Sequence, residues 1–81
     1  MTSDTQTPHE VDFQHIPTGG FFGECVQPTR AAAEQYAIDK LIGLGEERFE
    51  SEQAARFAGY TAADARTYAV RIYPSRTTSP S

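Results

Sequence analysis

The chain has 81 residues, 38% of them hydrophobic, and carries a formal net charge of −4 at pH 7. A chain of this length is at most one small domain, and such a domain buries only about 60% of the surface that its unfolded chain exposes. A single cysteine excludes an intrachain disulfide. The sequence contains neither a secretory leader nor a run of roughly 20 apolar residues, so we expect a cytoplasmic protein without membrane contact.

The charges are distributed unevenly along the chain. Residues 1–52 hold ten acidic side chains and three basic ones, whereas four arginines and one aspartate follow from Gln53 onward. The overall negative charge disfavours nucleic acid as a partner, because contacts to phosphate need cations. The basic second part nevertheless indicates a surface for a negatively charged partner.

Both ends of the chain are polar, contain proline and show no periodicity. We therefore expect residues 1–10 and residues 75–81 to be disordered tails.

Residues 11–28 are predicted to pack on the rest of the domain as an N-terminal arm. Two short apolar-containing runs flank the sequence PTGG, a spacing that suits a hairpin with Val11 and Phe13 on one face. The alternative is an irregular arm whose Phe21 and Phe22 fill gaps on a helical core. Either arm needs that core, because an isolated hairpin is only marginally stable in water.

Residues 29–74 are predicted to form a three-helix bundle, which makes the fold class mainly α. Thr29 can cap the first helix by accepting a hydrogen bond from a first-turn amide. Apolar residues then recur at three- and four-residue steps as far as Leu44, and Gly45 suits the end of the helix. Phe49 is expected to anchor the following acidic segment to the core.

Residues 51–70, SEQAARFAGYTAADARTYAV, are interpreted as a helix-turn-helix in which Gly59 provides the bend. Ser51 is expected to cap the first helix of this motif. Thr61 and Asp64 resemble a capping box at the start of the second helix. The expected inward positions are Tyr60, Ala65 and Tyr68.

The run QAARFAGYTAADARTYAVRIY resembles the N-terminal DNA-binding region of phage terminase small subunits. Those proteins show an A-A-x-x-A-G-Y-[ST] run followed by a helix with small residues at four-residue steps. The matching residues here are Ala54, Ala55, Ala58, Gly59, Tyr60, Thr61, Ala65 and Ala69. The resemblance implies a phage-derived DNA-binding protein, related to DNA packaging or regulation, in the cytoplasm of a bacterial host cell.

Double-stranded DNA is the partner that this interpretation predicts, with the second motif helix in the major groove. Arg66 is the candidate for reading guanine, and Arg56 and Arg71 are candidates for phosphate contacts. The predicted DNA-binding residues are Arg56, Thr61, Arg66, Thr67 and Arg71. We expect no catalytic residue, no cofactor and no metal site, because the histidines and Cys25 match no compact ligand pattern.

The alternative hypothesis is an acidic protein-interaction module. A basic partner would meet the acidic side chains of the first part, with Phe21 and Phe22 as the anchor. The acidic side chains in question are Glu34, Asp39, Glu46, Glu47, Glu50 and Glu52. A homo-oligomer also remains open, because a single unit with three or four phosphate contacts binds DNA weakly.

Overall fold

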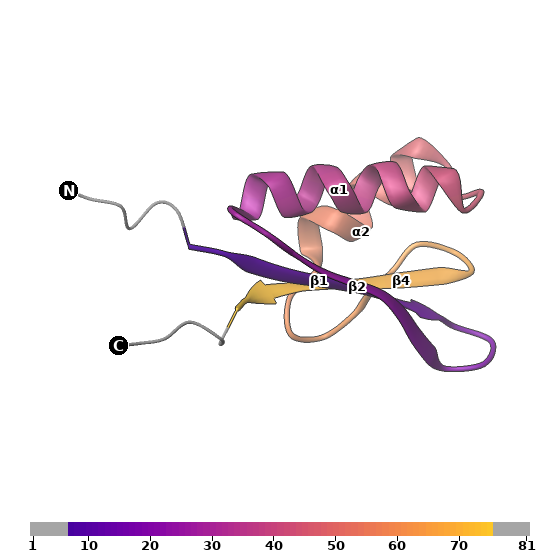
Figure 1. Cartoon of the computed structure of the whole chain (residues 1–81). Coiled ribbons are helices and arrows are strands. Elements are labelled where there is room, and N and C mark those ends of the chain that lie inside the picture. The colour runs from indigo at the N-terminus through magenta and orange to yellow at the C-terminus, as the bar shows by residue number, and fades with distance from the viewer. Residues whose placement is uncertain (1–6, 76–81) are drawn as a thin grey trace.

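The computed structural model describes residues 7–75. Its elements are β1 (His9–His15), β2 (Gly20–Gln27), α1 (Arg30–Gly43), α2 (Arg48–Phe57), β3 (Ala63–Asp64) and β4 (Tyr68–Pro74). The strands form one antiparallel sheet in the order β2-β1-β4-β3, and both helices lie on the same side of it (Figure 1). The prediction of a mainly α three-helix bundle is therefore wrong, and the fold is a two-layer α/β arrangement.

β1 and β2 form a hairpin, one of the two alternatives for residues 11–28. Val11 and Phe13 are both fully buried on the helix side, as their two-residue spacing predicts. Gly19 occupies the turn with a φ of 78°, a conformation that costs glycine little. The first strand begins at His9, so residues 9 and 10 belong to the sheet and not to a tail. Residues 7, 8 and 75, also predicted as tails, lie just outside the strands, and residues 1–6 and 76–81 lie outside the described residues.

β1 is a central strand of the sheet, because β4 pairs with the edge that β2 leaves free. In this register Val11 lies opposite Ile72, and Phe13 lies opposite Val70. All four side chains are fully buried. The hairpin is therefore part of the same folding unit as the helices, and not an arm added to a helical domain.

The first helix forms as the sequence predicts. The hydroxyl of Thr29 accepts a hydrogen bond from the amide of Ala32 at 3.1 Å, which caps the N-terminus of α1. The helix ends at Gly43 with Leu44 as its C-cap, and Gly45 follows with a φ of 106°. The buried side of α1 packs into the hydrophobic core. The core comprises Val11, Phe13, Ala33, Ala37, Leu41, Ala54, Ala55, Ala58, Val70 and Ile72.

The second helix differs from its prediction in start and orientation. α2 begins at Arg48, and Ser51 is not its cap: this serine is fully buried inside the helix, where its hydroxyl donates to the carbonyl of Glu47 at 2.8 Å. The buried side of α2 is its alanine side, with Ala54 and Ala55. Phe49, the expected anchor, points into solvent as a result.

No helix follows α2 within the described residues. Gly59 lacks the left-handed backbone that the predicted turn requires. The expected second motif helix is replaced by β3 and the start of β4, so the helix-turn-helix is absent and the capping box does not form. The physical reason is the segment YAVRIYP, in which Val70 and Ile72 alternate with Arg71 and Tyr73. This two-residue period and its β-branched and aromatic residues favour a strand, and the free edge of β1 supplies backbone hydrogen bonds to it.

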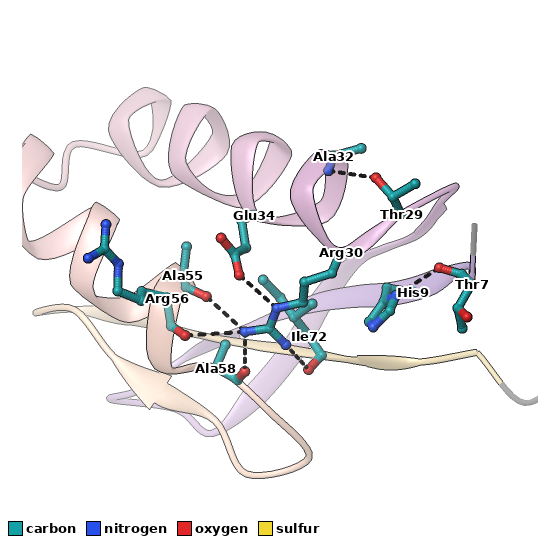
Figure 2. A network of polar contacts seen from close by, with 10 residues as sticks. All are labelled: Thr7, His9, Thr29, Arg30, Ala32, Glu34, Ala55, Arg56, Ala58 and Ile72. Atoms are coloured by element: carbon teal, nitrogen blue, oxygen red, sulfur yellow. Dashed lines mark hydrogen bonds and ion pairs between the residues drawn. The ribbon is translucent and has the colours of Figure 1, made fainter. Parts of the chain in front are cut away.

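Arg30 joins both helices to the sheet. From the first turn of α1 its guanidinium donates to the carbonyls of Ala55, Arg56 and Ala58, at 3.4, 3.2 and 2.8 Å (Figure 2). It also donates to the carbonyl of Ile72 in β4 at 3.2 Å. The carbonyls at the end of α2 have no partner within that helix, so one side chain satisfies several of them.

Glu46, in the loop between the helices, holds the turn between β3 and β4. Its Oε2 atom accepts hydrogen bonds from the amides of Arg66, Thr67 and Tyr68 at 3.4, 2.9 and 2.9 Å. Consecutive amides that converge in this way form an anion-binding nest. Glu46 is only 7% exposed and is a structural residue, not part of an acidic partner surface.

Candidate functional site

The sheet has one face without helices, which we call the open face. Side chains alternate across a strand, so the residues between the buried positions of β1 and β4 point to this face. The strand register adds their neighbours from β2 and β3. The open face comprises Glu10, Asp12, Gln14, Phe21, Glu24, Val26, Asp64, Ala69, Arg71 and Tyr73.

An ion pair occupies the middle of the open face. Arg71 on β4 lies opposite Asp12 on β1. The Arg71 Nε atom donates to Asp12 Oδ1 at 2.8 Å, and an Nη atom donates to Oδ2 at 2.5 Å. The Asp12 side chain is only 6% exposed. Hydrogen bonding to Asp12 raises the pKa of Arg71, so Arg71 keeps its positive charge, which the bidentate contact with Asp12 already engages.

Aromatic side chains surround this pair. The Arg71 guanidinium carbon lies 4.4 Å from the centroid of the Phe21 ring and 5.5 Å from that of Tyr73. The Tyr73 ring stacks on Tyr60 with centroids 5.4 Å apart, and its hydroxyl donates to Glu10 Oε1 at 3.2 Å. Burial first, then the charges of Asp12 and Glu10, raise the pKa of Tyr73. Contacts from β1, β2 and β4 therefore hold together a group that we call the platform, which comprises Phe21, Tyr60, Arg71 and Tyr73.

Apolar surface remains accessible around the platform. Phe21 is 51% exposed, Val26 is 56% exposed and Tyr60 is 63% exposed. Single exposed apolar residues are normal on a protein surface, but three on or beside one face make it a candidate binding surface. Tyr60 was expected to point into the core, and its exposure follows from the missing second motif helix.

A shallow pocket of about 380 Å³ opens beside Phe21, lined by Asp12, Phe21, Phe22, Gly23, Glu24 and Arg71. A bulge shapes this pocket: the β1–β2 register shifts between Val11 and Phe13. Gly23 has a φ of 70°, and a Cβ atom there would come within 3.0 Å of a ring carbon of Phe13. The bulge therefore depends on glycine.

The open face is negatively charged. Glu10, Asp12, Glu24 and Asp64 contribute four carboxylates, and Arg71 is the one cation that the described residues place on it. Since Asp12 binds that cation, the remaining three carboxylates give the face a net charge of −3. A face of this kind attracts cations.

The five residues predicted to bind DNA do not share one helix. Arg56 lies on α2, Thr61 lies in the loop before β3, and Arg66 and Thr67 lie in the turn before β4. Arg71 lies on the open face. The Arg66 Nε atom is 3.9 Å from Glu50 Oε1, and the Thr67 carbonyl accepts a hydrogen bond from the amide of Ile16 at 2.9 Å. These positions do not form the recognition surface of a helix-turn-helix.

The histidines and the cysteine have structural neighbours. His9 Nδ1 is 2.9 Å from the Thr7 carbonyl, and His15 Nδ1 is 3.0 Å from the Thr18 hydroxyl. The Gln27 side chain donates to Cys25 Sγ at 3.4 Å. Among residues 7–75, no three histidine, cysteine or carboxylate side chains come together in a group that could hold a metal ion.

The comparisons with known proteins give no neighbour. A scan against protein-family models, a search of curated proteins and a search of solved structures found no match to this chain. In the described part of the chain, neither helix is long and apolar enough to cross a membrane.

Of the open-face aromatic side chains, only Phe21 was predicted as a partner contact. Neither Asp12 nor Tyr73 was predicted as a site residue. The signal for both was the two-residue alternation: Asp12 lies between two buried apolar residues, and Tyr73 follows the buried Ile72. Their pairing across strands needed the register of β1 with β4, which the helical interpretation of residues 61–70 had excluded.

Proposed function

We propose that this chain is a protein-interaction module that binds a basic protein segment on the open face of its sheet. One observation carries the proposal: exposed Phe21 and Tyr60 flank a sheet face with net negative charge. Aromatic anchors with a complementary charge around them are the usual composition of a protein-binding surface. A protein-interaction module is the alternative function expected from the sequence, and the binding site that we propose for it lies on the sheet.

The same charge argues against duplex DNA. DNA binding requires several cations that contact phosphates. On the open face, Arg71 is engaged by Asp12 through two hydrogen bonds, so a phosphate would have to displace a carboxylate from it. On the rest of the described surface Arg30, Arg48 and Arg66 have carboxylate partners, which leaves only Lys40 and Arg56 without an ion pair. The helix that was predicted to enter the major groove is also absent from the described residues.

Arginine is the partner side chain that this face fits best. Its guanidinium stacks on an aromatic ring and pairs with a carboxylate at the same time. Arg71 already shows this mode within the protein, over the Phe21 ring and against Asp12. Two further sites combine an aromatic ring with a carboxylate. Tyr60 stacks on Tyr73, whose hydroxyl donates to Glu10. Phe21 and Glu24 line the same pocket.

The test is a titration of isotope-labelled protein followed by amide chemical shifts. The probe is a short peptide in which arginine alternates with valine, and a peptide with glutamate in place of arginine is the negative control. We expect shifts on β1, β2 and β4 with the arginine peptide alone, weakened as salt rises. A mixed-sequence DNA duplex serves as the competing ligand.

Matched variants locate the binding. Phe21→Ser removes an open-face ring and Tyr60→Ser removes the ring that stacks on Tyr73 beside this face. Phe49→Ser, the control, removes a still more exposed ring from the helix side. The first two should each weaken peptide binding about tenfold, a loss typical of an interface anchor, and the third should not. Binding of duplex DNA, or peptide shifts confined to the helices, contradicts the proposal.

A further inference from the structure

A second exposed apolar surface lies on α2. Phe49 and Phe57 are 70% and 72% exposed, more than any other large apolar side chain among the described residues. They stand eight positions apart with Gln53 midway, so the three share one side of the helix. We call this surface the α2 ridge, and it comprises Phe49, Glu52, Gln53, Arg56 and Phe57.

The α2 ridge carries one charge of each sign on the same flank. Glu52 and Arg56 are four positions apart, on the side of the ridge next to Phe49. Within the described residues the Arg56 guanidinium has no ion-pair partner, and Figure 2 shows it directed away from the Arg30 network. Glu52 has only an exposed contact with Arg48, at 3.4 Å.

We propose that the α2 ridge binds a second copy of this chain in an antiparallel, twofold-symmetric dimer. With a rise of about 1.5 Å per residue, pairing about Gln53 brings Phe49 of each copy level with Phe57 of the other. A twofold axis of this kind places equivalent flanks together. Arg56 of one copy then lies about 3 Å along the axis from Glu52 of the other, twice in the dimer, so the ridge complements its own charge.

The area available sets the strength of this dimer. Four phenylalanines that are mostly exposed in the monomer bury about 500 Å² when they pack together. The whole contact then lies near the small end of specific interfaces, below about 1,200 Å². The dimer is therefore weak and dependent on concentration.

The dimer and the open face do not compete for the same surface. α1 and α2 cover one side of the sheet, and the open face is the other side (Figure 1). A dimer through the α2 ridge therefore presents two open faces, which strengthens binding to a partner with two basic segments. The dimer itself does not depend on the function proposed for the open face.

Sedimentation velocity over a range of protein concentrations tests the dimer. The full chain should shift from monomer toward dimer as concentration rises, and Phe49→Asp should remain monomeric throughout. Phe21→Asp is the matched control on the open face and should dimerise as the unmodified chain does. Thermal unfolding of each variant confirms that the exposed substitution leaves the fold intact.

A charge exchange tests the orientation of the two helices. Arg56→Glu gives a ridge with two negative charges, and Glu52→Arg gives one with two positive charges. Each variant alone should dimerise about tenfold more weakly than the unmodified chain, because two like-charge contacts replace two attractive ones. An equal mixture should recover the affinity as a heterodimer, which native mass spectrometry identifies by its mass.

Three outcomes overturn the proposal. The first is a chain that stays monomeric at millimolar concentration. The second is a dimer that survives Phe49→Asp but is lost in Phe21→Asp, since association then uses the open face. The third is a mixture of charge variants that associates no better than either variant alone.

Discussion

Arg30, at the start of α1, donates a hydrogen bond of 2.8 Å to the carbonyl of Ala58, the C-cap of α2. The positive charge of Arg30 also interacts favourably with the negative, C-terminal end of the α2 helix dipole. A single side chain at the beginning of one helix therefore closes the other, and its contact with Ile72 extends the connection to the sheet.

Replacing Arg30 by lysine should destabilise the fold, although the charge is kept. A lysine ammonium has three donors and no planar fork, so it cannot satisfy the carbonyls of α2 and β4 together. We expect a loss of about 2 kcal/mol in the free energy of unfolding, measured by urea denaturation. Arg48→Lys, in an exposed ion pair, is the control and should change stability by less than about 0.5 kcal/mol.

Glu46→Ala should loosen the turn between β3 and β4. The substitution leaves three converging amides without an acceptor, in a place that is mostly closed to solvent. We expect a loss of about 2 kcal/mol and faster hydrogen exchange at Thr67 and Tyr68. The neighbouring Glu47→Ala, at an exposed position, should leave exchange at these two amides unchanged. Equal exchange in both variants would show that Glu46 does not hold the turn.

Gly23→Ala should destabilise the β1–β2 hairpin by about 2 kcal/mol. A side chain at this left-handed position is strained, and its Cβ atom meets the Phe13 ring. Gly43→Ala is the matched control, because it lies in α1 with no atom within 4 Å of the added Cβ. Alanine is the better helix former, so this control should unfold at the same or a higher urea concentration. An unchanged midpoint for Gly23→Ala would disprove the role assigned to the bulge.

Stability should fall in alkaline solution because of Tyr36 and Tyr73. Burial is the main reason that the folded state raises the pKa of both phenols above the ordinary value of 10.0. The unfolded chain therefore releases these protons first as pH rises. The stabilisation is present below about pH 10 and is lost as pH increases through the folded pKa. Unfolding free energies at about pH 8 and about pH 11 should differ less in Tyr73→Phe than in the unmodified chain.

The local signals of the first helix were sufficient to predict it. Thr29, the apolar spacing as far as Leu44 and the glycine at position 45 all act within a few residues of one another, and the structure keeps each of them. The spacing of Val11 and Phe13 likewise predicted a common buried face. The choice of hairpin over irregular arm was not decidable from this segment alone, because its stability comes from β4.

The prediction was wrong within residues 51–70, where the alanine-rich sequence is compatible with either a helix or a strand after Gly59. Ala54, Ala55 and Ala58 are small enough to pack α2 closely, and the same composition suggested a second helix after Gly59. The alternation in YAVRIYP was the opposing signal, and it decided the structure because β1 had an unpaired edge. That edge lies more than 50 residues away in the sequence, so a local pattern could not reveal it.

The pairing of β1 with β4 also has a kinetic consequence. Asp12 and Arg71, partners in the middle of the sheet, are 59 positions apart. The β1–β2 hairpin and α1 can form early from neighbouring residues, but the central ladder has to close a loop that contains nearly the whole domain. During synthesis the inner faces of the hairpin and of both helices therefore remain uncovered until residues 68–74 leave the ribosome. The pairing of β4 with β1 is therefore the folding step with the largest loop to close.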